Sequence, residues 1–325
     1  MIAIRRQRGV AVITALLIVA LAITISAGIA TDVTLEARRT GNLISSDQAL
    51  QYIKAAERLA VNVLTEDGKD NETDHLQEAW AQIIPPIPID GGQVIGAITD
   101  LNRCMNINSV DPSFAGTSSG GSEPAVSPAT AIDRLKLLVS DPAIGFRPEA
   151  VDAIVDWIDP DTDTTFPGGA EDGHYLYLDP PYRTANQTFK SVSTLRLVKG
   201  FEDPKKFANL LPFICAVDAA TTINVNTAPA EVLSSLDSSL DISDVNAIIS
   251  SRESQPFETL KDFTAVNGIS EKLGSEGGLS VSSNYFLLTS RIQIGNARRT
   301  FYSVISRTGA TTDNARVISR TWNTL

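Results

Sequence analysis

The chain has 325 residues, two cysteines, two histidines and a formal net charge of −11, and 43% of its residues are hydrophobic. This length allows two domains, and the acidic charge disfavours nucleic acid and anionic lipid headgroups as partners. The sequence has no Cys/His cluster with zinc-site spacing, no nucleophile elbow, no phosphate loop and no dinucleotide fingerprint, so we expect no enzymatic activity.

A short basic leader and a long apolar helix are predicted at the N-terminus. Arg5, Arg6 and Arg8 precede Gly9, and residues 10–30 contain no charged side chain. These 21 residues, rising about 1.5 Å each, make roughly 31 Å of helix, enough to cross the hydrocarbon layer of a bilayer. Because basic residues come before the apolar run and acidic residues follow it, we expect a cytoplasmic N-terminus and a globular part across the membrane.

This N-terminal segment suits three kinds of protein. A secreted protein would lose it by cleavage near Ala30, and a simply anchored protein would keep it whole. The order of basic residues, Gly9 and apolar helix also resembles the leader of type IV pilins and of type II secretion pseudopilins. In those families a prepilin peptidase cuts after the glycine and methylates the new first residue, which implies removal of residues 1–9 and N-methylation of Val10. The helix then serves as a membrane anchor and later packs in a filament core.

Thr14 departs from the usual pilin pattern. Most pilin-like subunits carry Glu at the fifth mature position, and counting from Val10 that position is Thr14. A carboxylate in an apolar helix is costly unless it is paired, and in the resembled families this Glu is thought to pair with the N-terminal amine of a neighbouring subunit. Its absence is typical of the largest minor pseudopilin, protein K of the general secretion pathway.

The next segments predict a helix packed on a sheet. Apolar residues at spacings of three, four and seven continue the helix through residues 31–66, and its second half is expected to lie on a sheet. A polar loop is expected at residues 67–74. Turns at Gly295-Asn296 and Gly309 separate the last three predicted strands. All the predicted strands have partly alternating or apolar patterns, at 93–101, 104–108, 285–294, 300–307 and 316–322.

Between the early and late strands the sequence predicts a large helical insertion. It follows a flexible linker at 115–124, with helical patterns at 131–140, from Pro148 onward and through 228–272. We therefore predict an α+β, pilin-like fold, in which a long N-terminal helix packs on an antiparallel sheet and a large, mostly α-helical domain is inserted. The expected limits are a leader at 1–9, a membrane or filament-core segment at 10–30, a pilin-like domain at 31–110 and 280–325, and an inserted domain at 111–279 with an acidic loop at 156–175.

A pair of cysteines and a repeated asparagine motif lie in or beside the insertion. Cys104 and Cys215 form an even pair, which outside the cytoplasm permits one disulfide, and two buried thiols are the alternative. Such a bond would close a loop of about 110 residues and stabilise the fold by roughly 4–5 kcal/mol in the chain-entropy model. Asn106-Ile107-Asn108-Ser109 and Asn224-Val225-Asn226-Thr227 form a weak internal repeat, and each puts a polar cap ahead of a helical block.

The richest local chemistry lies in the acidic loop. Hard oxygen ligands on a turn-rich loop suit calcium, and like-charge repulsion favours a cation if the loop is partly buried. Magnesium fits less well because it prefers to keep its waters. Six carboxylates fall within seventeen residues and face no obvious cationic partner in the sequence: Asp156, Asp159, Asp161, Asp163, Glu171 and Asp172.

The loop is not an EF-hand, and two alternatives to calcium stay open. Thr164 stands where an EF-hand has Gly, and Ala170 stands where it has the bidentate Glu. The first alternative is a solvated acidic turn. The second is a glycosidase carboxylate pair, which usually needs aromatic platforms. The aromatic residues near the loop are Trp157, Tyr175, Tyr177 and Tyr182.

Several segments together resemble protein K of type II secretion systems over essentially the whole chain. They are the leader, the segment VDAIVDWIDPDTD with the later GGAEDGHY, INVNTAPAEVL at 223–233, and an ending with Tyr285-Phe286, Arg307 and Arg320-Thr321-Trp322. The resemblance implies a minor pseudopilin that caps the tip of the periplasmic pseudopilus and supports export of folded proteins across the outer membrane. It also implies a single-pass protein of a Gram-negative inner membrane, with its globular part in the periplasm.

The resemblance further implies partners and a structural calcium. The partners are two other minor pseudopilins (proteins I and J), the major pseudopilin, the prepilin peptidase and the inner-membrane assembly platform. A bulky insertion that would clash with a subunit stacked above it, and the missing carboxylate at Thr14, both fit a tip position. Asp156 is held back from the metal site because it lies on the helical side. The implied calcium ligands are Asp159, Asp161, Asp163, Glu171 and Asp172.

Residues 223–270 also resemble the helix-hairpin-helix modules of competence proteins. This gives a second hypothesis, a membrane-anchored periplasmic DNA-binding protein. Those modules grip phosphates through a Gly-apolar-Gly hairpin whose N–H groups point outward. Here the first hairpin, at 238–243, has no glycine and carries Asp241, and the second keeps only Gly268. In an acidic chain these departures argue against DNA binding, so we expect the packing of the module to survive without its ligand chemistry.

Overall fold

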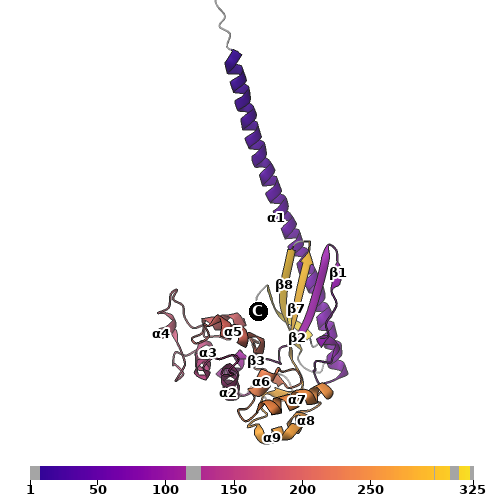
Figure 1. Ribbon diagram of the computed structural model, residues 1–325, viewed down its shortest axis with the longest axis vertical. Coiled ribbons are helices and arrows are strands. Elements are labelled where there is room, and N and C mark those ends of the chain that lie inside the picture. The colour runs from indigo at the N-terminus through magenta and orange to yellow at the C-terminus, as the bar shows by residue number, and fades with distance from the viewer. Residues whose placement is uncertain (1–7, 115–125, 296, 308–314, 323–325) are drawn as a thin grey trace, which may run out of the picture.

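The described chain forms a long helix, a five-stranded sheet and a helical insert (Figure 1). The computed structural model describes residues 8–114, 126–295, 297–307 and 315–322. The leader residues 1–7, the predicted linker at 115–124 and the turn residues Asn296 and Gly309 lie outside the described residues.

Helix α1 (Arg8–Asp70) confirms the predicted rod as one continuous helix. Residues 10–44 are all exposed, and this part of α1 projects away from the rest of the molecule (Figure 1). In the described part of the chain, α1 is the one helix long and apolar enough to cross a membrane. It continues into the predicted polar loop because no proline interrupts it, and a Lys69–Glu66 ion pair (2.7 Å) lies along its end.

The second half of α1 packs on one face of an antiparallel sheet, as predicted. Ile53 is fully buried in a cluster with Phe301, and Leu64 is fully buried in a cluster with Phe286 and Ile305. The strand order is β1-β2-β7-β8-β9. The bounds are Ile87–Ile89 for β1, Gly92–Asp100 for β2, Tyr285–Ile294 for β7, Ala297–Arg307 for β8 and Ala315–Trp322 for β9.

Alternation along the strands gives the sheet two different faces. Phe286 and Leu288 of β7 are buried on the face that α1 covers. On the opposite face, Leu287 lies between Thr99 of β2 and Val304 of β8 in the strand register. Leu287 and Val304 contact the cluster that contains the two cysteines, so this second face adjoins the insert.

The insert occupies the connection between the neighbouring strands β2 and β7. Where the chain leaves and returns, the Leu101 N–H donates to the Tyr285 carbonyl (2.9 Å). The structure therefore places the limits of the insert near residues 101 and 284, outside the predicted limits of 111 and 279. The reason is that the predicted strand at 104–108 is only Met105–Asn106 (β3), which pairs in parallel with Ile214–Cys215 (β4) of the insert and does not join the main sheet.

Short helices around one apolar core make up the insert. A second parallel pair joins β5 (Ile223–Asn224) to β6 (Leu279–Ser280). The helices are α2 (Pro128–Val139), α3 (Asp152–Ile158), α4 (Asp172–Tyr175), α5 (Pro204–Leu210), α6 (Ala230–Ser234), α7 (Ile242–Ser254), α8 (Leu260–Thr264) and α9 (Ile269–Lys272). Short 3-10 helices include Ile107–Val110, Pro148–Val151, Val192–Leu197 and Leu211–Phe213.

The weak Asn-x-Asn repeat has a structural counterpart in each half of the insert. The first asparagine of each motif accepts a hydrogen bond from the N–H two residues later (3.2 and 2.9 Å). The side chain of the second asparagine forms two hydrogen bonds with the backbone of a phenylalanine far away in the sequence. Asn108 donates to the Phe189 carbonyl (2.9 Å) and accepts from its N–H (2.8 Å). Asn226 does the same with Phe257 (2.9 Å each). Each motif therefore ties down a distant loop.

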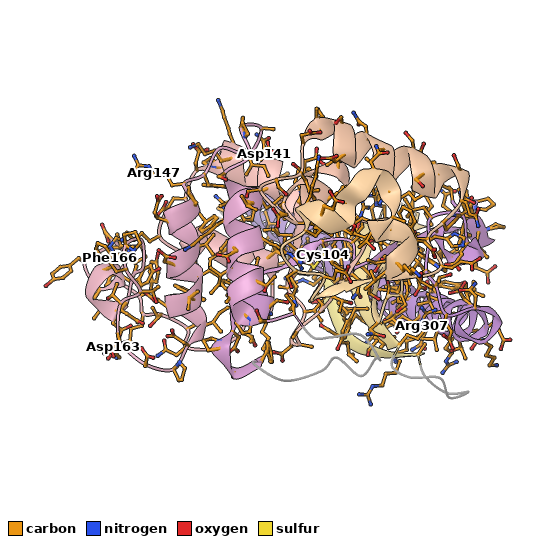
Figure 2. All side chains as sticks on the ribbon, turned by 90° about the horizontal axis from the view of Figure 1, so that it is seen from below. Cys104, Asp141, Arg147, Asp163, Phe166 and Arg307 are labelled. Carbon is orange, nitrogen blue, oxygen red and sulfur yellow. A yellow bond between two sulfur atoms is a disulfide. The ribbon has the colours of Figure 1, made fainter. Side chains whose placement is uncertain are left out.

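A buried polar network joins α1, the sheet and the insert where the chain crosses between them. We call Asp67, Asp74, Asp100, Ser283 and Arg307 the junction clasp. Arg307, at the end of β8, donates to Asp67 (2.8 Å) and to both oxygens of Asp74 (2.5 and 2.6 Å). Ser283 donates its N–H to Asp74 and its hydroxyl to Asp100, both at 2.7 Å. Figure 2 shows Arg307 beside α1, with Cys104 between it and the far part of the insert.

Candidate metal centre

The acidic loop folds back on the end of α3. Asp156, fully buried in α3, accepts the Thr165 N–H on both carboxylate oxygens (3.0 and 3.2 Å). Gly169 lies so close to Asp156 that a Cβ atom at this position would collide with the carboxylate. This close approach explains the glycine in the sequence. Figure 2 shows Asp163 and Phe166 at the end of the insert farthest from Arg307.

Three of the predicted ligands come together in this loop. One carboxylate oxygen from each of Asp159, Asp161 and Glu171 lies within 4.8 Å of the others. Asp159 is 8% and Glu171 7% exposed, whereas Asp161 is open to solvent. Asp159 Oδ1 and Glu171 Oε1 are buried and have no hydrogen-bond partner among the described residues. Because unpartnered buried carboxylate oxygens are unfavourable, this set fits a hard cation that would coordinate them and keep water on the Asp161 side.

The electrostatics of the three-carboxylate group point the same way. Burial, then the charges of Asp161, Asp156 and Asp111, raises the pKa of Asp159 to about 6. Burial, then the charges of Asp156 and Asp159, raises the pKa of Glu171 to about 7. Both carboxyl groups thus resist ionisation without a nearby positive charge. Sequence reasoning missed Asp111, which has no local acidic pattern around it and approaches only through the fold.

The structure places Asp163 and Asp172, the other two predicted ligands, outside this group. The Asp163 side chain is exposed, and its N–H donates to Asp161 Oδ1 (2.8 Å), so Asp163 shapes the loop through its backbone. Asp172 contacts Arg183 at 3.3 Å and accepts hydrogen bonds from the Thr184 N–H and hydroxyl (3.1 and 3.2 Å). The prediction that the acidic loop has no cationic partner was therefore wrong for Asp172.

Two of the four aromatic residues named near the loop belong to the core. Trp157 and Tyr175 are 3% and 0% exposed, with ring centroids 5.3 Å apart in an edge-to-face arrangement. Trp157 also stacks on Phe189 at 6.2 Å. Two other rings at the loop, Phe166 and Tyr177, are each 91% exposed. Burial of Trp157 and Tyr175 weakens the case for a glycosidase pair, because platform residues must be open to substrate.

A second acidic group, Asp67, Asp74 and Glu78, is explained by ion pairing. Its ligand oxygens are also within 4.8 Å of one another. Arg307 inserts its guanidinium between Asp67 and Asp74, as the junction clasp describes. Glu78 accepts the indole N–H of Trp80 (2.6 Å). These donors already satisfy the carboxylates, so this group does not need a metal ion.

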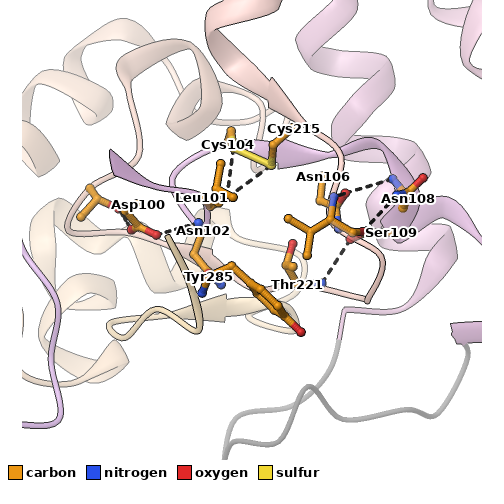
Figure 3. The surroundings of a disulfide bond; sticks show 12 residues. Asp100, Leu101, Asn102, Cys104, Asn106, Asn108, Ser109, Cys215, Thr221 and Tyr285 are labelled. Atoms are coloured by element: carbon orange, nitrogen blue, oxygen red, sulfur yellow. Dashed lines mark hydrogen bonds between the residues drawn. A yellow bond between two sulfur atoms is a disulfide. The ribbon is translucent and has the colours of Figure 1, made fainter. Parts of the chain in front are cut away.

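The two cysteines lie where the insert meets the sheet. The structure joins Cys104 and Cys215 in a disulfide, with Cα atoms 5.9 Å apart (Figure 3). Both sulfur atoms contact the carbonyl oxygen of Leu101, at 3.0 and 3.3 Å. Both residues are buried in a cluster with Leu287. The bond therefore fixes the β3–β4 pair against the sheet.

The predicted processing site lies at the start of α1. The Thr14 hydroxyl donates to the carbonyl oxygens of Val10 and Ala11, both at 3.0 Å. Its hydrogen-bonding capacity is used within its own helix, and it offers no charge to the amine of a neighbouring subunit. Cleavage between Gly9 and Val10 and methylation of Val10 stay predictions.

The helix-hairpin-helix region lacks the chemistry for phosphate. At the first hairpin, Asp241 accepts the N–H groups of Ser243 (2.8 Å) and Asp244 (3.1 Å) and forms a capping box with Asp244. An internal carboxylate therefore occupies the amides that would hold a phosphate. Gly268, in the second hairpin, has a positive φ of 71° and is the N-cap residue of the four-residue helix α9. Its positive φ lets the chain turn sharply just before α9.

Comparisons with known proteins agree over nearly the whole chain. Two family models described as type II secretion system protein K match residues 103–219 and 223–282. Type II secretion system protein K of Aeromonas hydrophila is 33% identical over 315 residues, covering 93% of this chain and 94% of that protein. The protein K of Pseudomonas aeruginosa is also 33% identical over 315 residues, covering 93% and 90%.

A solved structure agrees with the fold. A chain from the crystal structure of the GspK-GspI-GspJ complex of the enterotoxigenic Escherichia coli type 2 secretion system matches with a TM-score of 0.73 and 27% identity. The match covers 88% of this chain and 99% of that one. The resemblance recognised from the leader, the acidic loop and the ending is thereby confirmed. The chain belongs to the protein K family of type II secretion systems and is a minor pseudopilin.

Proposed function

We propose that this minor pseudopilin caps the tip of a periplasmic pseudopilus and so supports the export of folded proteins across the outer membrane. The shape of the molecule carries the proposal. The apolar part of α1, residues 10–30, is exposed, as is the rest of α1 up to residue 44, and the insert stands at the opposite end of the molecule (Figure 1). A solvent-exposed apolar rod of this length needs a cover, which lipid provides first and neighbouring helices provide later.

The exposed part of α1 would lie first in the inner membrane and later in the filament. It would anchor the precursor in the inner membrane as a single span, with the globular part in the periplasm. The prepilin peptidase would remove residues 1–9, and the assembly platform would then bring α1 beside the helices of the major pseudopilin. Thr14, which forms hydrogen bonds only within α1, supplies no carboxylate for the packing expected inside a shaft.

The position of the insert favours the top of the filament. The described part of the insert, residues 101–114 and 126–284, extends sideways and beyond the sheet at the end of the molecule opposite the free part of α1 (Figure 1). A subunit stacked above would have to occupy the same volume. The relative from Escherichia coli was solved with GspI and GspJ. We therefore propose the counterparts of those two proteins, the minor pseudopilins I and J, as the direct partners.

We also propose a structural calcium ion in the acidic loop. Asp159, Asp161 and Glu171 would hold it, and the ion would supply positive charge to two buried carboxylate oxygens that have no other partner among the described residues. A solvated acidic turn would leave those oxygens unsatisfied, which favours the cation. The ion would tie the end of α3 to the segment before α4, so its role is to hold the loop.

Photo-crosslinking in cells tests the tip position. A photoreactive residue in place of Val12 on α1 should capture other pseudopilins, because this surface packs in the bundle. The same residue in place of Glu271, exposed on α9 at the end opposite the N-terminus of α1 (Figure 1), should capture no major pseudopilin. Capture of the major pseudopilin from Glu271 would place subunits above this one and overturn the proposal.

A further inference from the structure

Residues 31–44 of α1 have no packing partner in the described structure, since every one of them is exposed. Contact with the sheet begins at Ser45 and Ser46, which are half-buried, and Ala49 is buried in a cluster with Phe301. The segment thus spans about 21 Å between the apolar run and the sheet (Figure 1). Its charged side chains keep it out of a hydrocarbon layer, so in the anchored subunit it stands in water. They are Asp32, Glu36, Arg38 and Arg39.

The sequence of this segment is poor in helix-forming residues. Seven of its fourteen residues are β-branched, Asp or Asn, and each lowers the weight of the helical state about threefold relative to alanine. Gly41 lowers it about fivefold. Together these residues lower the weight of the helix by a factor of roughly 10³–10⁴. The seven are Thr31, Asp32, Val33, Thr34, Thr40, Asn42 and Ile44.

A break in the middle of a long helix is opposed by nucleation. Two helices in place of one require a second nucleus, which is unfavourable by a factor of about 10³. This factor and the weakness of the segment are of the same order. Helix and coil are therefore close to balance for residues 31–44 in water. The later part of α1 differs, because buried Ile53 and Leu64 hold it on the sheet.

Local contacts within the segment add little to the helical state. The Arg39–Glu36 ion pair (3.2 Å) is exposed on both sides, and such pairs contribute little to stability. The hydroxyl groups of Thr31 and Thr34 donate to the carbonyl oxygens four residues earlier (2.9 and 2.7 Å). These bonds compete with the helical N–H groups for the same acceptors and tend to bend a helix.

Thr40-Gly41-Asn42 is the stretch where α1 breaks most easily. Three weak helix formers follow one another here, about one turn before Ser45 reaches the sheet. A Cβ atom on Gly41 would meet no atom within 4 Å. Close packing therefore does not explain the glycine, whereas a need for a weak point in the helix does.

Neighbouring helices could restore the helical state. Most helical stability in proteins comes from packing of an apolar face, and in this segment that face is uncovered. Its exposed apolar residues are Val33, Leu35, Leu43 and Ile44.

We propose that residues 31–44 are a joint between the membrane span and the globular part. In the anchored subunit the segment interconverts between helix and coil, so the globular part turns relative to its span while it meets its partners. In the filament, neighbouring helices pack on the segment and hold it helical. This inference rests on the proposed passage from membrane to filament and adds the conformational change that accompanies it.

Distances between paired spin labels test the joint in the full chain in lipid nanodiscs. The two native cysteines form a buried disulfide, so introduced cysteines are labelled selectively. One pair, Asp32→Cys with Asp47→Cys, crosses the segment, and the matched pair, Asp47→Cys with Asn62→Cys, lies in the packed half of α1. All three positions are exposed. Each pair is 15 residues apart, or about 22 Å in a helix.

The width of the distance distribution is the informative quantity, because a flexible chain of this length has a similar mean distance, roughly 20 Å. The pair across the segment should give a broad distribution, and the matched pair a narrow one. Replacing Thr40, Gly41 and Asn42 together with Ala raises the weight of the helix about fortyfold and should narrow the first distribution. Gln48→Ala with Gln51→Ala, both exposed in the packed half, is the control and should change neither distribution.

Binding of purified proteins I and J should also narrow the first distribution in the unchanged chain. A narrow distribution before any partner is added would overturn the joint and leave the proposed function intact. A broad distribution that the triple alanine variant does not narrow would also overturn it, because the motion would not come from weak helix formation. A distribution that stays broad in the complex would reject ordering by neighbours. Failure of both proteins to bind would instead contradict the proposed function.

Discussion

Replacing Glu171 with Gln should change stability in opposite directions with and without calcium. Burial and the charges of Asp156 and Asp159 raise the pKa of Glu171 from its ordinary value of 4.5 to about 7. Without calcium at pH 8, the folded chain must ionise this group at a cost of about 3 kcal/mol relative to an ordinary carboxyl group. Glu171→Gln avoids that cost, so its calcium-free form should melt roughly 5–10 °C above the unchanged chain.

With calcium present the order should reverse. In the proposed site Glu171 would then be a ligand, and a neutral amide binds calcium less strongly than a carboxylate does. Calcium at a hundred times its dissociation constant should stabilise the unchanged chain by about 2.7 kcal/mol, and the variant by less. Differential scanning calorimetry of the full chain in detergent, in EDTA and in calcium, measures both effects. Asp163→Asn removes a charge from the same loop outside the three-carboxylate group, and it should change neither melting temperature.

The pH dependence has a definite sign. The folded-state pKa values of Asp159 (about 6) and Glu171 (about 7) lie above their ordinary values, so without calcium the folded chain binds more protons than the unfolded chain. Calcium-free stability should therefore fall as the pH rises from about 4 through about 7, and calcium should suppress this fall. If Glu171→Gln proved less stable than the unchanged chain in both EDTA and calcium, the electrostatic account of this loop would be refuted.

Three further predictions concern the rest of the chain. Arg320→Met should cost about 3–5 kcal/mol in urea unfolding, because buried Glu57 loses two hydrogen bonds (2.7 and 2.5 Å). Burial opposes ionisation of Glu57, but hydrogen bonds from Arg320 and Ser303 lower its pKa, so the deficit should shrink as the pH falls below about 4.5, and a constant deficit would contradict this. Gly9→Val should leave the precursor uncut, as mass spectrometry of the N-terminus can show, and a mature chain that starts anywhere but Val10 would exclude a pilin-type leader. Replacing residues 101–284 with an Asn-Gly turn should leave α1 and the sheet folded by circular dichroism, because β2 and β7 are neighbours, and an unfolded product would show that the sheet needs the insert.

Most of the fold could be predicted because local signals decide it. The unbroken apolar and amphipathic pattern fixed α1, and alternation fixed β7 to the residue. The segment at 104–108 could not be placed in this way. Met105 and Ile107 are both buried, as in a strand, but the partner strand Ile214–Cys215 comes more than 100 residues later. Which sheet a short apolar run joins is a tertiary property.

The acidic site could be located from the sequence, but its members could not. Composition marks the loop, whereas the converging carboxylates are selected by the way the chain folds back after α3, where Asp156 holds the Thr165 N–H. Arg183 removes Asp172 from the group by pairing with it. The asparagine repeat was visible as a pattern, but its phenylalanine partners lie 31 and 81 residues away and leave no local trace.

The junction clasp determines how mechanical load would travel through this protein. Asp67 lies in the last turns of α1, and it shares the Arg307 guanidinium with Asp74. Ser283 extends the same contacts to Asp100, at the point where the chain enters the insert. The junction clasp thus joins α1, the sheet and the insert at one buried point, so the three parts are not connected by a flexible hinge. If a growing filament pushed or rotated the base of α1, as the proposed function implies, the insert would move with the sheet, and both axial force and torque would reach the surface that the insert contacts.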